Sequence, residues 1–159
     1  MSQRPVREVL DSVVDPEIPV LTIADLGVLR DVVEVDGRVE VTITPTYSGC
    51  PAMDTIRAEI ETALQAAGYT SVTVRTVLAP AWTTDWMTAA GKAKLAEYGI
   101  APPELQPPLV GPVPVQLAVR CPQCGSGDTR MQSRFGSTSC KSLWVCNACR
   151  EPFDHFRAL

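Results

Sequence analysis

Four cysteines near the carboxyl terminus have the types and spacing of metal ligands. Cys121 and Cys124 form one Cys-x-x-Cys pair, and Cys146 and Cys149 form a second. Each such pair can turn two thiolates onto one ion at tetrahedral angles, and two pairs complete a structural zinc site. The other interpretation, two redox pairs, would need a surrounding βαβ pattern that the sequence lacks. We therefore predict one structural zinc ion, which supplies the folding free energy of a small β ribbon.

Two further residues in this region leave their roles open. Cys140 lies between the two pairs. It fits a small buried residue on a ribbon strand, an additional thiolate that permits iron-sulfur ligation, or a surface thiol that acts together with Cys50. His155 is the single histidine of the chain, so a three-histidine catalytic zinc site is excluded. We expect His155 to pack against the ribbon.

A sixth cysteine, Cys50, lies in the segment Thr-Tyr-Ser-Gly-Cys-Pro at residues 46–51. Pro51 suits the first position of a helix, which would make Cys50 the N-cap, where the helix dipole favours a thiolate. Thr46 and Ser48 add hydroxyl groups that suit the binding of an anion or a metal. The alternative is that Cys50 only caps the helix. The pattern favours a functional thiolate, because cysteine is a poor cap.

An acidic turn, Asp-Pro-Glu-Ile-Pro at residues 15–19, precedes this segment. Its carboxylates, Asp15 and Glu17, could face the same pocket as Cys50. Proline at these positions also ends helices and leaves solvated acids, and physical chemistry alone favours this second interpretation.

Hydrophobic periodicity predicts the elements that position these residues. Apolar residues recur at helical spacing over 6–14 and again from Ile56 to Ala67, which is followed by Gly68. Two strand-like segments, 29–35 and the alternating 38–44, flank Asp36-Gly37, a strong hairpin signal. A strand over 71–78 and a helix over 86–98 complete the order α-β-β-α-β-α. We predict an α+β fold: a small α/β sandwich with a three-stranded sheet, followed by a small β zinc ribbon.

The organisation into domains follows from a proline-rich segment. Residues 100–116 contain six of the chain's prolines and almost no charge, which indicates an extended spacer. We predict a first domain over 1–99, a linker over 100–116 and the four-cysteine ribbon over 117–159. Segments 115–119 and 143–145 are expected to be strands of the ribbon.

Composition narrows the range of partners. The net charge is −4 and the sequence pI is about 5.0, which argues against nucleic-acid binding. No apolar stretch is long enough to cross a membrane, and the first residues do not form a signal peptide. We therefore expect a cytoplasmic protein that binds neither nucleic acid nor a membrane, and its cysteines then favour metal or redox chemistry over disulfides.

Three motifs in order resemble the SufT-like, or MIP18-like, family of iron-sulfur cluster assembly factors. They are the acidic turn at 15–19, Ile-Ala-Asp-Leu-Gly-Val-Leu at 23–29, and the cysteine segment at 46–51. The resemblance covers residues 6–90. It implies that Cys50 is the cluster-handling thiolate, with Asp15, Glu17 and Asp25 as acidic positions near it.

The carboxyl-terminal ribbon extends the resemblance to almost the whole chain. Residues 79–86 and 149–156 are similar to those of accessory proteins of phenylacetyl-CoA epoxidase systems. This implies maturation rather than catalysis. The expected client is the [2Fe-2S] reductase subunit of the oxygenase, and other epoxidase or iron-sulfur assembly components are expected partners.

A single Cys50 cannot hold a cluster alone, because clusters normally take four thiolate ligands. A homodimer with ligands lent by a partner, or Cys140 brought over by the ribbon, could complete a transient site. A competing hypothesis makes the chain an adaptor whose ribbon docks onto the oxygenase complex. A thiol enzyme is disfavoured because no base is evident beside Cys50.

Overall fold

The computed structural model describes residues 3–104 and 118–158. The chain divides into two compact units, Met1–Gly91 and Lys92–Leu159.

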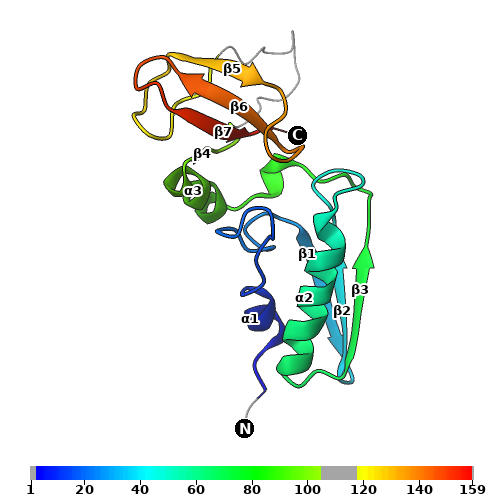
Figure 1. The fold of residues 1–159 in the computed structure, drawn as a ribbon. Helices are drawn as coiled ribbons and strands as arrows, with labels where there is room; N and C mark the ends of the chain where they lie inside the picture. The colour runs from blue at the N-terminus through cyan, green and yellow to red at the C-terminus, as the bar shows by residue number, and fades with distance from the viewer. Residues whose placement is uncertain (1–2, 105–117, 159) are drawn as a thin grey trace. The chain divides into compact units, whose positions relative to one another are not determined.

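The first unit is built on a three-stranded sheet in the order β1-β2-β3 (Figure 1). β1 (Leu29–Val35) and β2 (Arg38–Ile43) are antiparallel, as predicted. Asp36 and Gly37 join them with φ values of 50° and 75°, the left-handed conformation that a tight hairpin requires. β3 (Ser71–Thr76) is parallel to β2 and therefore needs a crossover connection, which contains helix α2 (Ala52–Ala66).

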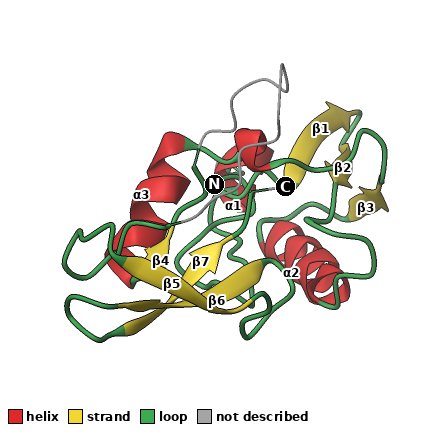
Figure 2. Ribbon diagram, turned by 90° about the horizontal axis from the view of Figure 1, so that it is seen from above, coloured by secondary structure: helices red, strands yellow, loops and turns green. Residues whose placement is uncertain are grey.

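The core of this unit lies between the sheet and its helices. α2 runs along one face of the sheet (Figures 1 and 2), and α1 (Val6–Leu10) contacts α2. Alternate residues of β2 and one stripe of α2 are buried, as a half-covered sheet and an amphipathic helix require: Val39, Val41, Ile43, Ile56, Ile60 and Leu64.

Two helices differ from their predicted ranges. α1 ends at Leu10 and not at residue 14, because the following residues pair with a later part of the chain: Val14 forms an isolated bridge with Thr22. The helix predicted over 86–98 is divided into the 3-10 turn η1 (Thr84–Trp86) and α3 (Ala89–Tyr98). Met87, with an extended ψ of 138°, interrupts the helical backbone between them.

The second unit contains a four-stranded sheet in the order β4-β7-β6-β5. Its strands are β4 (Ile100–Ala101), β5 (Thr129–Ser133), β6 (Lys141–Cys146) and β7 (Pro152–Phe156). Leu143 to Val145 lie in β6, as predicted. The strand predicted over 115–119 is absent at Ala118 and Val119, and residues 115–117 lie outside the described part.

A small apolar cluster supports this sheet. It consists of two cysteines together with the buried residues Ala101, Val119, Trp144 and Phe153. The segment predicted as a linker begins with β4, which pairs in parallel with β7, and residues 105–116 of that segment lie outside the described part. The domain boundaries drawn from the sequence remain predictions.

The fold class predicted from the sequence is confirmed. The chain is α+β, with a three-stranded sheet in the first unit and a cysteine-rich β ribbon in the second. Among the described residues, no helix has the length and apolar character needed to cross a membrane.

Candidate functional site

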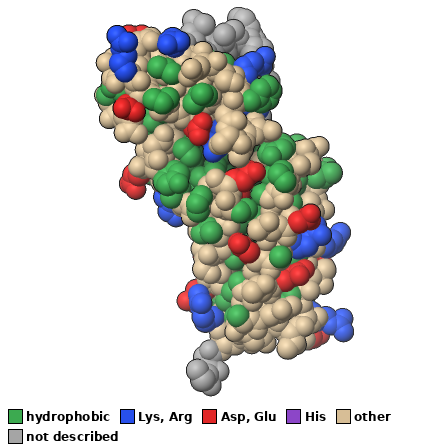
Figure 3. Space-filling view, viewed as in Figure 1, with side chains coloured by type: hydrophobic (Ala, Val, Ile, Leu, Met, Phe, Trp, Pro, Cys, Tyr) green, Lys and Arg blue, Asp and Glu red, His purple; other side chains and the backbone are tan. Residues whose placement is uncertain are grey.

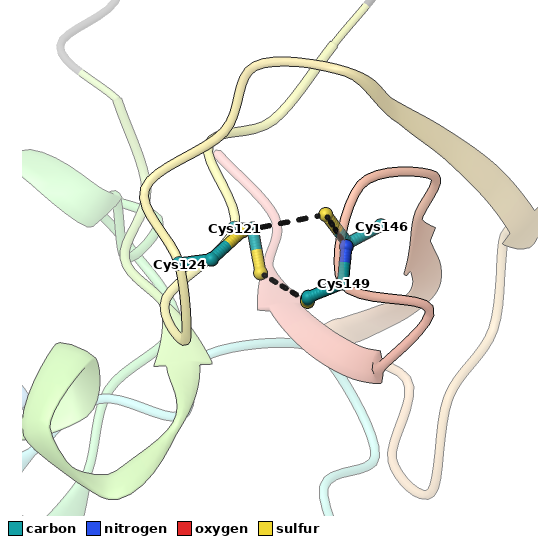
Figure 4. Close-up of side chains that lie close together, drawn as sticks. All are labelled: Cys121, Cys124, Cys146 and Cys149. Carbon is teal, nitrogen blue, oxygen red and sulfur yellow. Dashed lines mark hydrogen bonds between the residues drawn. The ribbon is translucent and has the colours of Figure 1, made fainter.

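The four paired cysteines are held by two turns of the same design (Figure 4). The N–H of Gly125 donates to the carbonyl of Cys121 over 2.9 Å, and the N–H of Arg150 donates to the carbonyl of Cys146 over 3.0 Å. Gly125 and Arg150 have φ values of 75° and 69°. Each turn therefore bends the backbone directly after its second cysteine, so that both sulfurs of a pair point to the same side.

The four sulfur atoms all lie within 4.8 Å of one another. The Sγ atoms of Cys121 and Cys149 are 3.8 Å apart, and those of Cys124 and Cys146 are 3.6 Å apart. Tetrahedral ligation at a zinc–sulfur distance of about 2.3 Å implies a sulfur–sulfur distance of roughly 3.8 Å. The donor set and its spacing therefore fit one tetrahedral metal ion.

The surroundings of Cys146 favour its ionised form. The backbone N–H of Cys149 points at the Cys146 sulfur over 3.5 Å. This hydrogen bond is the main cause that lowers the pKa of Cys146 to about 7. A thiolate is the form that binds a metal, so the turn prepares this ligand.

Cys140 stands apart from this group. It is only 3% exposed, and its sulfur lies 3.0 Å from the hydroxyl of Thr138. The interpretation as a surface thiol is therefore wrong, and within the described ranges the cluster of four ligands does not include Cys140. Of the three interpretations, a small buried residue fits best.

His155 packs inside the ribbon, as predicted. It is 3% exposed, its ring meets that of Trp144 edge to face at 6.1 Å, and its Nδ1 lies 3.4 Å from the hydroxyl of Ser142. Burial, with a smaller contribution from the charge of Arg157, lowers the pKa of His155 to about 4. The ring is thus neutral at physiological pH.

Cys50 lies immediately before helix α2 but is not its N-cap. The helix begins at Ala52 and Pro51 is the N-cap, so the cap lies one residue later than predicted. The N–H of Cys50 donates to the carbonyl of Tyr47 over 3.3 Å, which closes a four-residue turn. Gly49, the third residue of this turn, has a φ of 81°, a value that favours glycine.

The environment of Cys50 does not activate its thiol, contrary to the prediction. Burial is the largest influence and raises the pKa of Cys50 above its ordinary value. Hydrogen bonds from the N–H of Ala52 and from the side chain of Tyr47 lower the pKa, while the charges of Glu17 and Asp15 raise it. The helix terminus does stabilise the thiolate, but loss of solvent and the nearby carboxylates outweigh it.

The acidic turn lies close enough to Cys50 for the charges of its two carboxylates to raise the pKa of the thiol. Asp15 also shapes the turn itself: its Oδ1 accepts hydrogen bonds of 2.8 Å from the N–H groups of both Glu17 and Ile18. The interpretation as a proline-ended helix with solvated acids is not borne out, because α1 ends at Leu10 and Asp15 is only 5% exposed. The carboxylate of Asp15 closes the turn, and the charge of Glu17 acts on the cysteine.

The remaining predicted site residues are placed differently. Asp25 is 9% exposed, and its carboxylate accepts hydrogen bonds from Thr22 and Thr88. Thr46 is half-buried and Ser48 is exposed. None of these three is among the groups that shift the pKa of Cys50, so their part in handling a cluster remains a prediction.

Tyr47 is a residue of this site that the sequence did not reveal. Its side chain bonds to the Cys50 thiol. It lies between Thr46 and Ser48 in the same motif, but no local pattern reveals where an aromatic side chain in a turn will point. The position of Tyr47 within the motif was the one feature of the sequence that could have indicated its role.

Two family matches cover different parts of the chain, one within each compact unit. Residues 3–75 match the family described as iron-sulfur cluster assembly protein, and residues 106–157 match the PaaD zinc β ribbon domain. Together with the four-cysteine site they define the class of protein: an iron-sulfur cluster assembly domain followed by a zinc β ribbon.

Individual relatives agree with this class. A protein of Escherichia coli (strain K12) that is described as a subunit of a "Putative 1,2-phenylacetyl-CoA epoxidase" is 47% identical over 94% of this chain and 89% of its own length. An Fe-S protein maturation auxiliary factor of Porphyromonas gingivalis is 36% identical over 54% of this chain and 83% of its own length. The chain belongs to the PaaD family, which includes this epoxidase subunit.

Solved structures resemble the first unit. A domain of unknown function, DUF59, from Bacillus anthracis has a TM-score of 0.53 and 27% identity, and it covers 57% of this chain and 87% of that one. A conserved hypothetical protein from Thermotoga maritima has a TM-score of 0.50 and 29% identity, and it covers 60% of this chain and 98% of that one. The expectation of a MIP18-like first unit is thereby confirmed.

Proposed function

We propose that this chain is a maturation factor that handles an iron-sulfur cluster, or its iron and sulfide, for a phenylacetyl-CoA epoxidase system. The client is the [2Fe-2S] reductase subunit of that oxygenase, and other epoxidase or iron-sulfur assembly components are partners. One observation carries the proposal: Cys50 lies in a tight turn, close enough to Glu17 and Asp15 for their charges to act on its thiol, within a domain of the iron-sulfur assembly family.

The geometry supports transfer rather than storage. A half-buried thiol whose pKa is raised releases a soft metal more readily than a preformed thiolate does. Because Cys50 supplies only one sulfur, the remaining ligands come from a second copy, a partner or small thiols. Cys140 is not suited to this purpose, because it is buried within the ribbon.

The chain acts as an accessory protein and not as an enzyme in this proposal. The one histidine is buried and neutral in the ribbon, so it cannot serve Cys50 as an accessible base. The ribbon takes one structural zinc ion at Cys121, Cys124, Cys146 and Cys149. We place the protein in the reducing cytoplasm, where such thiolates persist.

Charge distribution favours proteins as partners. The net charge is −4, and on the visible face of the first unit acidic and basic side chains are interspersed (Figure 3). This pattern does not suit a phosphate backbone. We accordingly propose no binding to nucleic acid or to a membrane.

Co-expression of the Cys50→Ser variant with the reductase subunit tests this proposal. Iron and sulfide per reductase should fall several-fold relative to wild type. Cys140→Ala is the matched control, because it removes a buried cysteine outside both sites and should leave the cluster content unchanged. Full occupancy of the reductase with the Cys50 variant would refute the proposal.

A second candidate function is an adaptor whose ribbon docks onto the oxygenase complex. Two exposed apolar side chains favour it: Met131 on β5 is 46% exposed and Phe135, just after that strand, is 65% exposed. The double variant Met131→Ser with Phe135→Ser should weaken association with the complex at least tenfold in a pull-down titration, whereas Cys50→Ser should not. Unchanged association of the double variant would exclude docking through this surface.

A further inference from the structure

Residues 82–91, which we call the clamp segment, lie between the two parts of the chain that match known families, 3–75 and 106–157. They bind the loop of residues 22–28 within the first unit. We propose that the clamp segment holds the acidic turn in place against Cys50, so that Trp82 and Thr88 are positioning residues of the candidate site.

Direct hydrogen bonds join the clamp segment to the loop. The indole N–H of Trp82, a residue only 5% exposed, donates to the carbonyl of Leu26 over 2.9 Å. The backbone N–H of Thr88 donates to the carbonyl of Asp25 over 2.9 Å, and its hydroxyl donates to Oδ1 of the same residue over 3.2 Å. Asp25 also forms two hydrogen bonds with Thr22. The N–H of Thr22 donates to Oδ2 of Asp25 over 3.2 Å, and the N–H of Asp25 donates to the hydroxyl of Thr22 over 3.0 Å. The Asp25 carboxylate thus ties the loop to the clamp.

The two backbones also approach too closely for side chains at two glycines. A Cβ atom at Gly27 would lie 2.5 Å from the carbonyl oxygen of Trp86, and one at Gly91 would lie 2.9 Å from the carbonyl oxygen of Asp25. The guanidinium of Arg30 stacks on the Trp86 ring, 3.5 Å from its centroid. The interface therefore combines close contact with specific polar pairing.

The loop carries this constraint to the acidic turn. The N–H of Ile23 donates to the carbonyl of Val13, and the N–H of Asp15 donates to the carbonyl of Leu21, each over 2.9 Å. Residues 13–15 and 21–23 thus run as a short paired ribbon, with Val14 bridged to Thr22. A segment that fixes residues 22–27 therefore also fixes Asp15, and with it Glu17.

Two influences raise the pKa of the Cys50 thiol. Burial has the largest effect, and the charges of Glu17 and Asp15 in the acidic turn act in the same direction. A loosened clamp lets the turn withdraw and lets water enter. The half-buried Cys50 thiol then becomes more accessible and reacts faster with an alkylating agent.

This inference deepens the proposed function, because it names residues that position the same site. Its test uses thiol chemistry and no client protein, so either idea can fail without the other. The zinc-loaded full chain is alkylated with iodoacetamide at pH 8, and modification of Cys50 is followed by peptide mass spectrometry. Thr88→Val, a close match in shape, and Trp82→Phe, which keeps an aromatic ring but removes the indole N–H and part of the ring system, should each speed alkylation about two- to fivefold.

A matched control and a double variant distinguish positioning from general loosening. Thr83→Val removes a hydroxyl that accepts a bond from Asp85 of its own segment, and it should leave the rate unchanged. Glu17→Gln should speed alkylation by itself. In protein that already carries Glu17→Gln, Thr88→Val should increase the alkylation rate by a smaller factor than it does in the wild type. Unchanged rates in both clamp variants, or effects that multiply independently of Glu17, would overturn the proposal.

Discussion

The side chain of Tyr47 bonds to the thiol of Cys50 across a turn that the backbone of the same two residues closes over 3.3 Å. The bond stabilises the thiolate against burial and against two nearby carboxylates, so this hydroxyl is one of the few groups that favour ionisation of Cys50. The pKa of the Cys50 thiol therefore depends on each of these neighbours separately.

Tyr47→Phe should therefore raise the pKa of Cys50 further. Its alkylation rate at pH 8 should fall about threefold, and the midpoint of its pH–rate profile should move upward. Zinc-loaded Cys50→Ser protein serves as the control, because its alkylation reports only the other cysteines. An unchanged midpoint would mean that the hydroxyl does not interact with the thiol in solution.

Loss of one ribbon ligand should unfold the second unit. Structural zinc contributes on the order of 10 kcal/mol in small ribbons, and only a small apolar cluster remains without it. Cys146→Ser should abolish stoichiometric zinc and remove the folded signals of β5 to β7 in an NMR spectrum. Cys140→Ala, which leaves all four ligands intact, should keep one zinc per chain. A Cys146→Ser variant that is folded without zinc would contradict this prediction.

Acid should destabilise the ribbon through His155. The folded pKa is about 4 and lies below the ordinary value of 6.5, so the unfolded chain takes up this proton first. The contribution of the neutral ring is complete above about pH 6.5 and is lost as the pH falls towards 4, to the extent of about 3 kcal/mol.

The comparison that checks this uses His155→Gln, since ligand protonation affects both proteins alike. The difference in unfolding free energy between wild type and variant should narrow or reverse between pH 6.5 and 4, and stay constant above about pH 7. A difference that does not depend on pH would show that His155 titrates normally in the fold.

Gly27 and Gly37 offer a matched pair for the close contact between loop and clamp. Their φ values are 77° and 75°, but a Cβ atom at Gly37 would meet nothing within 4 Å, while one at Gly27 would overlap Trp86. Gly37→Ala should cost about 1–2 kcal/mol from the backbone alone. Gly27→Ala should cost at least about 2 kcal/mol more in urea unfolding, because the added methyl group overlaps backbone atoms. Equal losses of unfolding free energy in the two variants would mean that the clamp segment moves to accommodate the added methyl group without cost.

Local patterns predicted much of this protein. The spacing of Cys121, Cys124, Cys146 and Cys149 predicted their cluster, and Asp36-Gly37 predicted the hairpin, because both depend on residues close in sequence or on a repeated short turn. The amphipathic stripe of α2 predicted its buried face for the same reason.

Tertiary structure alone decided the character of Cys50. Helix position suggested an activated thiolate, but burial and the acidic turn, which lies far earlier in the chain at residues 15–19, raise the pKa instead. Desolvation depends on what surrounds a group in space, and no local pattern contains that information.

The role of Asp25 was decided in the same way. The sequence marked it as an acidic residue of a known motif, whereas the fold pairs it with Thr88, 63 residues further along the chain. Contacts of this separation form only when the core has assembled, since the whole intervening chain must be ordered first. The sequence therefore predicted which residues carry the chemistry, with the exception of Tyr47, and the packed fold determined how their charges act on one another.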